Sequence, residues 1–315
     1  MEQVDTVPLI VLGGSDRRAG ALPEGAGGRT VLVGYKGTAV RIGGQPLIEH
    51  LLDEARACGR FAPLYVAGPA EAYRELRGVE LIETDRSFGR NIRAGLEAVT
   101  ARHPGSQVAF LTCDVLPGAA ALRKLLDDWR HGPSCDLFFP IVRAPVSDDQ
   151  LGASAWKPRY RIVPSEGQAG VSVLPGHLVI ARPEALRLPF LYHLLELGYR
   201  SRNRSIAYRR IYMVAGTLGI LIAQDVRHAL RLRMPNFAWS VLSAGLMAAT
   251  KLRAGTLTRA ELEDALRRVF VTWRWRRDHP ESRVRTPLVE SLGLALDIDT
   301  VEEARQHGGR IGTPA

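Results

Sequence analysis

The sequence is poor in cysteine: Cys58, Cys113 and Cys135 are the only three among 315 residues. Three thiols so far apart exclude a disulfide framework and a zinc site built from closely spaced cysteines. Long hydrophobic runs are also missing. A membrane-spanning helix needs about 20 consecutive apolar residues, whereas "IYMVAGTLGILIAQ" (211–224) is shorter and "NFAWSVLSAGLMAAT" (236–250) contains several polar residues. Buried helices of a helical subdomain are therefore expected in this region.

Motifs of several protein classes are absent as well. The chain contains neither a G-x-x-x-x-G-K-[ST] loop nor a G-x-G-x-x-G turn, which argues against an ATPase or a dehydrogenase. It shows no nucleic-acid-binding module and no aromatic stacking motif, so no nucleic-acid partner is predicted. No basic-then-apolar leader precedes the first apolar run, "VPLIVLGG" (7–14), and a cytoplasmic protein with free thiols is expected.

Positive charge is concentrated in one part of the chain. Residues 157–285 contain 23 lysines and arginines against 9 acidic residues, whereas residues 1–156 contain 17 against 19 and residues 286–315 contain 2 against 5. Such a block favours anionic partners, namely a phosphorylated substrate, a membrane surface or nucleic acid, and no motif supports the last of these. The alternative explanation of this block is a general use of arginine in place of lysine, without any anionic partner. Peripheral membrane contact through residues 200–285 is one of the open possibilities.

The first half of the chain alternates between strand and helix patterns. The runs that predict short buried strands are "VPLIVLGG", "APLYVAG", "VELIET", "QVAFLTCD" and "CDLFFPIVR". The segments with apolar residues at helical spacing are "PLIEHLLDEARACG", "FGRNIRAGLEAVTARH" and "GAAALRKLLDDWR". Because apolar strands that alternate with helices form mostly parallel sheets covered on both faces, the predicted fold class is α/β. We expect a Rossmann-like sheet with an appended helical segment.

Four parts of the chain are predicted. Residues 1–198 form the α/β core, within which the Gly-, Pro- and Ser-rich stretch 143–176 is either a binding loop or a plain connector. Residues 199–285 form a basic helical insertion. Residues 286–307 return to the core as a strand and a short helix, "LALDIDTVEEARQ" (294–306), and residues 308–315 are a flexible tail.

Two turns of the core are candidates for chemistry. In "VLGGSDRR" (11–18), glycines that follow a strand let backbone N–H groups approach phosphate oxygens closely, although many such turns bind nothing. In "AFLTCDVLPG" (109–118), a buried strand ends on Asp114 directly before a turn. This carboxylate serves either the turn alone or a hard cation at the edge of the sheet.

Six motifs, taken in order, resemble those of one family. They are "LGGSDRR" with a later lysine, "GGQPLIEHLLDEA", "YVAG", "FGRNIRAGLEA", "FLTCDVLPG" and "LALDIDTVEEA". In this order the chain resembles nucleotidyltransferases of the glycosyltransferase-A type, and among them the MobA-like group. That group includes molybdenum-cofactor guanylyltransferases and relatives that act on sugar or cofactor phosphates. The resemblance covers residues 7–190 and 288–305, and the helical stretch between them matches no motif.

The resemblance implies the residues of a site. Asp114 and Asp299 are implied as Mg²⁺ ligands, and Asp297 would share a strand face with Asp299 because side chains at i and i+2 point the same way. Lys36 matches the signature lysine of the family best. The implied nucleotide-binding turn comprises Leu12, Gly13, Gly14 and Ser15, followed by the catalytic arginine Arg18.

A second loop is predicted on the nucleotide side. "SFGRNIRAGL" (87–96) would expose Gly89, Arg90 and Asn91 to the base or ribose ahead of a helix, unless it is a plain helix N-terminus. His177, in "PGHLVIA", falls on the acceptor side, where a packing role and a functional role are both open.

The resemblance implies a reaction. The expected enzyme transfers a nucleoside monophosphate from an NTP to a phosphorylated small-molecule acceptor, depends on Mg²⁺ and releases pyrophosphate. One alternative is glycosyl transfer from a nucleotide sugar, but that reaction usually goes with an Asp-x-Asp strand end, and "TCDVLP" has a single acid. The other alternative is a non-catalytic nucleotide-binding protein of the same fold. The sequence does not assign the base, the acceptor or the oligomeric state.

Overall fold

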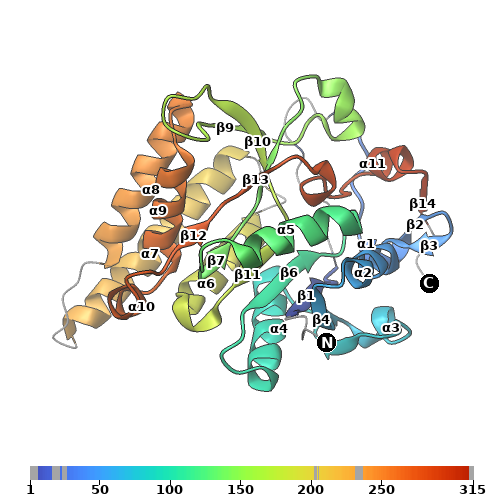
Figure 1. Cartoon of the computed structure of the whole chain (residues 1–315), viewed down its shortest axis with the longest axis horizontal. Helices are drawn as coiled ribbons and strands as arrows, with labels where there is room; N and C mark the ends of the chain where they lie inside the picture. Colours follow the sequence, from blue (N-terminus) through green and yellow to red (C-terminus); the bar gives the residue numbers. More distant parts are fainter. Residues whose placement is uncertain are drawn as a thin grey trace.

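The computed structural model describes residues 6–15, 22, 27–201, 204, 206–230 and 237–311. Its centre is a mixed sheet (Figure 1). Within the described residues the strands of this sheet are, in spatial order, β12 (Val284–Arg285), β7 (Leu137–Phe138), β11 (Val179–Ala181), β6 (Val108–Thr112), β1 (Val7–Leu12), β4 (Phe61–Gly68) and β5 (Glu80–Glu83). Strand β11 runs antiparallel to both of its neighbours, and the other pairings are parallel.

Strand β1 shows why the sheet is covered on both faces. All six of its residues are buried. Leu9 and Val11 pack into one hydrophobic cluster, whereas Ile10 and Leu12 pack into another, because successive side chains of a strand point to opposite faces. A continuous apolar run such as "VPLIVL" therefore indicates a strand with helices on each side.

Helices cover the two faces. The described helices are α1 (Lys36–Ala39), α2 (Leu47–Cys58), α3 (Ala70–Tyr73), α4 (Phe88–Arg102), α5 (Ala119–His131), α6 (Leu188–Ser201), α7 (Ile206–Leu230), α8 (Phe237–Ala254), α9 (Arg259–Phe270), α10 (Trp273–Asp278) and α11 (Val301–Gln306). Helices α2 and α5 pack on one face of the sheet, and α4 and α6 pack on the other. The predicted α/β fold class is confirmed.

Two smaller sheets flank the central one. The first has the order β13 (Leu288–Val289), β8 (Ile141–Arg143), β10 (Val171–Pro175) and β9 (Tyr160–Ile162), and the second has the order β14 (Gly309–Ile311), β2 (Val40–Ile42) and β3 (Gln45–Pro46). Strand β14 pairs antiparallel with β2, so the prediction of a flexible tail from residue 308 is wrong for residues 309–311. The backbone hydrogen bonds to β2, far away in sequence, order this segment.

The segment that was expected to return as a strand is different. Residues 294–300 form no strand, and contact the core through isolated bridges from Asp297 to Val115 and from Thr300 to Val31. Helix α11 begins at a capping box in which Thr300 and Glu303 satisfy each other's backbone N–H groups. The short helix predicted there is present.

The basic segment is helical, as its apolar spacing predicts. Helices α7 to α9 lie beside the end of the central sheet that carries β12 (Figure 1). The last two residues of the predicted insertion form β12 and belong to the central sheet. In the described part of the chain, no helix is both long enough and apolar enough to cross a membrane.

Candidate active site

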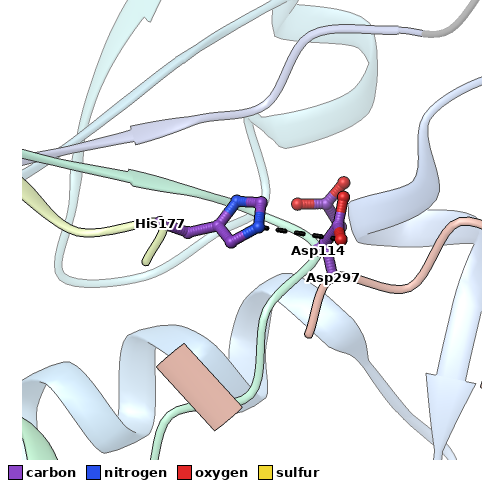
Figure 2. Close-up of side chains that lie close together, drawn as sticks. All are labelled: Asp114, His177 and Asp297. Atoms are coloured by element: carbon purple, nitrogen blue, oxygen red, sulfur yellow. Dashed lines mark ion pairs between the residues drawn. The ribbon is translucent and has the colours of Figure 1, made fainter. Parts of the chain in front are cut away.

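Three side chains from distant parts of the chain converge at one end of the central sheet (Figure 2). Asp114 follows β6, His177 lies between β10 and β11, and Asp297 precedes α11. Each offers one ligand atom, and these atoms lie within 4.8 Å of one another. His177 Nε2 is 3.6 Å from Asp297 Oδ1. The other ring nitrogen, Nδ1, is 3.1 Å from the Thr112 hydroxyl, which holds the ring orientation.

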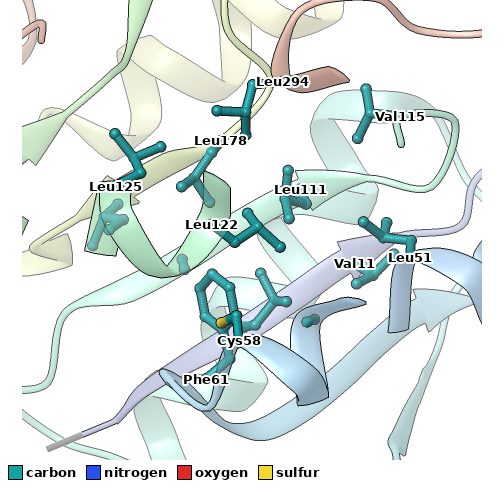
Figure 3. Packing of buried hydrophobic residues seen from close by; sticks show 14 of the residues in the cluster. Val11, Leu51, Cys58, Phe61, Leu111, Val115, Leu122, Leu125, Leu178 and Leu294 are labelled. Atoms are coloured by element: carbon teal, nitrogen blue, oxygen red, sulfur yellow. The ribbon is translucent and has the colours of Figure 1, made fainter. Parts of the chain in front are cut away.

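The hydrophobic core holds these three residues in place. Leu111 and Val115 on either side of Asp114, Leu178 beside His177, and Leu294 before Asp297 all belong to one buried cluster (Figure 3). The backbone connects the same segments. The N–H of Ile298 donates to the Asp114 carbonyl at 2.8 Å, and the N–H of His177 donates to the Leu294 carbonyl at 2.7 Å. The packing and these hydrogen bonds therefore fix the positions of Asp114, His177 and Asp297, which we call the acidic cluster.

Two buried lysines pair with the acids. Lys36 Nζ lies 2.5 Å from Asp299 Oδ1 and 3.5 Å from Asp114 Oδ2. Lys157 donates to the Asp297 carboxylate, and its Nζ lies 3.3 Å from Asp299 Oδ2 and 3.5 Å from Glu303 Oε1. Asp299 is thus held between two ammonium groups, whereas Asp297 reaches toward Asp114 and His177.

The pKa values of these groups follow from burial and pairing. Burial and the neighbouring Asp299 carboxylate raise the pKa of Asp297 to about 6, against the opposing effects of His177 and Lys157. For Asp299, burial acts upward, but Lys36 and Lys157 outweigh it and hold the pKa well below its usual range. Burial acts to lower the pKa of Lys157, but three carboxylates raise it above its usual range. Asp299 and Lys157 are therefore charged at neutral pH.

The acidic cluster fits a hard divalent cation. Asp114 Oδ1 is buried and has no hydrogen-bond partner, and an unpaired buried carboxylate oxygen costs free energy unless a cation or donor meets it. Mg²⁺ prefers carboxylate oxygens and retains several waters. Asp114 and Asp297 offer such oxygens on one side of the cluster. Imidazole is a less typical ligand for Mg²⁺, so His177 suits a role in orienting Asp297.

A cavity of about 610 Å³ opens over the cluster. Of the residues implied by the resemblance, its lining includes Leu12, Gly14, Ser15, Lys36, Asn91, Asp114, Asp297 and Asp299. The structure thus brings together the glycine-rich turn, the lysine and the acids. Arg18 lies outside the described residues.

Other residues implied by the resemblance have packing positions. Gly13 lies against the ring of Tyr73, where an added Cβ would come within 2.6 Å of a ring carbon. Gly89 lies against α6, where a Cβ would come within 2.9 Å of the Tyr192 carbonyl oxygen. Both glycines are required by close approach of neighbouring groups.

The loop predicted to precede a helix is part of that helix. Helix α4 begins at Phe88, so Gly89, Arg90 and Asn91 occupy its first turn. Arg90 is exposed, but Gly89 and Asn91 are buried, which corrects the expectation that all three are exposed. The Asn91 amide oxygen accepts from the Thr84 hydroxyl at 2.8 Å and from the Arg86 N–H at 3.0 Å. This leaves its Nδ2 facing the glycine-rich turn, next to Gly14.

Gly14 allows a direct test of the nucleotide side. A Cβ at this position would lie 2.9 Å from Asn91 Nδ2, and a branched side chain would also enter the space that a phosphate needs. We expect Gly14→Val to abolish NTP binding measured by calorimetry while the protein stays folded. Gly27→Val is the control, since a Cβ there meets nothing within 4 Å. Unchanged affinity in folded Gly14→Val would remove this turn from the site.

Reasoning from the sequence missed Lys157. It lies in the stretch 143–176, which stands out in the sequence only for its Gly, Pro and Ser content. A signal was present, because the chain has only four lysines, Lys36, Lys124, Lys157 and Lys251, in a very arginine-rich composition. Two of the four are buried in this site. A compact ammonium has three donors and can contact several carboxylates at once, as Lys157 does with Asp297, Asp299 and Glu303.

Known proteins resemble this chain in sequence and fold. A profile of the MobA-like NTP transferase domain matches residues 26–207. A hypothetical transferase from Thermus thermophilus has a similar fold, with a TM-score of 0.56 and 20% identity over 95% of this chain and 99% of that chain. The solved CMP:2-keto-3-deoxy-manno-octonic acid synthetase complexed with CTP is similar at a TM-score of 0.43 and 13% identity, over 94% of each chain. No match is found among curated proteins. Because the profile spans more than half of the chain and includes Lys36, Asp114 and His177, the chain belongs to the MobA-like NTP transferase family.

Proposed function

We propose that this protein transfers a nucleoside monophosphate from an NTP to a phosphorylated small-molecule acceptor, depends on Mg²⁺ and releases pyrophosphate. One observation carries the proposal. A buried lysine, two carboxylates that fit a divalent cation, and a glycine turn open to phosphate oxygens all line the same cavity. Phosphoryl transfer needs this combination, since its catalysis rests on positioning and charge stabilisation.

The reaction is a single displacement. An oxygen of the acceptor phosphate forms a bond to the α-phosphorus of the NTP, the bond from that phosphorus to the bridging oxygen breaks, and pyrophosphate leaves with the electron pair. An acceptor phosphate is ionised near neutral pH, because its second pKa is about 6. It therefore needs no general base.

The chain's own residues position and neutralise the reactants. Gly14 and Ser15 offer backbone N–H groups on the phosphate side of the cavity. Asp299 and Asp114 hold the Lys36 side chain in place, so its ammonium stabilises the charge that builds up on the leaving pyrophosphate. His177 and Lys157 hold Asp297. Asp114 and Asp297 would hold Mg²⁺, which neutralises charge on the transferred phosphate when it is bound.

A pyrophosphate-release assay tests the proposal. The protein is incubated with each common NTP, Mg²⁺ and a panel of phosphorylated acceptors, with a chelator as the metal-free control. We expect release that depends on both the acceptor and the metal. Consumption of a nucleotide sugar in place of an NTP would show glycosyl transfer. Tight NTP binding without turnover across the panel would show a non-catalytic protein.

A substitution of Lys36 tests its role in the same assay. We expect Lys36→Met to lower the rate of pyrophosphate release at least about a hundredfold, the loss typical when a group that stabilises charge in the transition state is removed. Lys124→Met is the control, because Lys124 is exposed on α5. Equal rates in the two variants would exclude Lys36 from the reaction.

A further inference from the structure

A second cavity of about 370 Å³ adjoins the active site. Its wall consists almost entirely of aliphatic and phenylalanine side chains from α4, β6, β11, α6 and α9. The two cavities share part of their lining, including Leu12, Phe88, Thr112, His177, Leu191 and Phe270. The second cavity is therefore an apolar extension of the active-site cavity, which itself opens over the acidic cluster.

Polar groups in the lining are confined to the shared end. Thr112 and His177 are the polar residues among the described residues that line the second cavity. The side chains of Thr112 and His177 are hydrogen-bonded to each other, and His177 in turn contacts Asp297. A ligand that extends from the acidic cluster into this space thus passes from a charged environment into a wholly apolar one.

The lining excludes two simple occupants. A nucleobase would bury its ring nitrogens and carbonyl oxygens against aliphatic walls without hydrogen-bond partners, which is unfavourable in an apolar environment. Water needs two to four polar partners, and in this cavity it would find them only at Thr112 and His177, so an apolar ligand is favoured over water along the rest of the wall. An apolar group remains as the occupant that the walls favour.

We propose that the acceptor is an amphiphilic phosphate, that is, a phosphate monoester whose other end is an alkyl or similar apolar group. This inference rests on the proposed function and specifies its acceptor. The phosphate lies at the Asp114 and His177 end, and the apolar group fills the second cavity. A water occupies about 30 Å³ in the liquid, so the 370 Å³ cavity has room for about a dozen groups of methylene size.

The helical segment supports this acceptor class. Helix α9, which forms part of the cavity wall, belongs to the basic helical segment 199–285, and α6, which forms another part of the wall, leads into that segment. Helices α7 and α8 expose large apolar side chains, among them Ile211, Ile222, Trp239 and Leu246. Exposed apolar residues in an arginine-rich part of the sequence suit contact with an anionic lipid surface, where amphiphilic phosphates reside.

The test measures binding and needs no turnover. Calorimetry compares ethyl, butyl, hexyl and octyl phosphate with the wild-type protein. Each buried methylene is worth about 0.8 kcal/mol, or about fourfold in affinity, so we expect at least about a hundredfold between ethyl and octyl phosphate. Affinity that does not depend on chain length would overturn the proposal.

A variant locates the effect. Val179 on β11 lines the second cavity and is only partly buried, so Val179→Phe places a ring in that space. We expect it to reduce octyl phosphate affinity to the ethyl phosphate level. Val171→Phe, at a partly buried valine on β10 in another sheet, is the matched control. Tight octyl phosphate binding in folded Val179→Phe would overturn the assignment, and the wild-type chain-length series stands by itself if either variant fails to fold.

Turnover separates this inference from the proposed function. Pyrophosphate release that is equal with ethyl and octyl phosphate would overturn the inference and leave the proposed function intact. Chain-length-dependent binding without release from any NTP would contradict the proposed function and retain the amphiphile site. Sedimentation with phosphatidylcholine vesicles that contain phosphatidic acid distinguishes a membrane source from a soluble one, and binding that falls with salt is expected for the membrane source.

Discussion

Replacing Asp114 with asparagine is expected to lower the rate of Mg²⁺-dependent pyrophosphate release at least about a hundredfold. The substitution preserves side-chain shape but removes the charge of the carboxylate whose Oδ1 is buried without a hydrogen-bond partner. The same carboxylate lies 3.5 Å from the Lys36 ammonium. The variant should therefore bind Mg²⁺ more weakly and orient Lys36 less well. The measurement is the rate at increasing Mg²⁺ concentration, with circular dichroism to confirm folding.

Asp53→Asn is the control for Asp114→Asn. Asp53 is exposed on α2 and pairs with Arg56 at the surface, where an ion pair contributes little to stability. We expect it to keep the wild-type rate. If folded Asp114→Asn also keeps that rate, the carboxylate serves only the turn after β6 and the proposed site is wrong.

Asparagine substitutions of the two acids near α11, Asp297 and Asp299, should have different effects in the same assay. The resemblance places the second metal ligand at Asp299, whereas the geometry favours Asp297, which lies with Asp114 and His177. We expect Asp297→Asn to raise the Mg²⁺ concentration needed for activity. Asp299→Asn should instead lower the rate at saturating Mg²⁺, because Asp299 holds Lys36. The opposite result would restore Asp299 as the ligand.

Lys157→Met is expected to destabilise the protein by about 3–5 kcal/mol, the loss found when one partner of a buried ion pair is removed. The side chain of Lys157 is only 6% exposed and faces the carboxylates of Asp297, Asp299 and Glu303. Methionine fills similar space but leaves these charges together in a buried site. Denaturation in urea at pH 7.5 measures the free energy of unfolding.

The loss of stability caused by Lys157→Met should be smaller in acid than at neutral pH, as the directions of the pKa shifts indicate. In the wild type, Lys36 and Lys157 lower the pKa of Asp299, so this pairing stabilises the fold above the unfolded pKa of about 3.9 and its contribution is lost as pH falls. In the variant, burial and mutual repulsion raise the carboxyl pKa values, and protonation in mild acid relieves the repulsion. The difference between the two proteins should therefore be smaller at pH 4.5 than at pH 7.5.

Lys251→Met is the control for Lys157→Met. Lys251 also pairs with a glutamate, Glu261, but both side chains are substantially exposed. We expect a change below about 1 kcal/mol there, as for surface ion pairs. A loss of similar size in Lys157→Met at pH 7.5 would contradict the buried-pair account.

The sequence by itself determined the framework of the site. Apolar runs such as "VPLIVL" and "VAFLT" predict buried strands, and the second run ends two residues before Asp114, which places that carboxylate at the edge of the sheet. Strand periodicity and turn residues are local features, because they depend on neighbours within a few positions. Lys36 and the acids near residue 298 were indicated only by the resemblance of the ordered motifs to one family.

Only the tertiary structure decided which groups meet. Lys157 and Asp297 are 140 residues apart, yet they are bonded in the buried site. The apolar cavity likewise combines walls from β6, β11, α6 and α9, none of which indicates a cavity alone. Strand β14 forms by pairing with β2, which is far away in the sequence. Such contacts arise from how elements pack across the whole chain, and the spacing of residues in one segment contains no information about its distant partners.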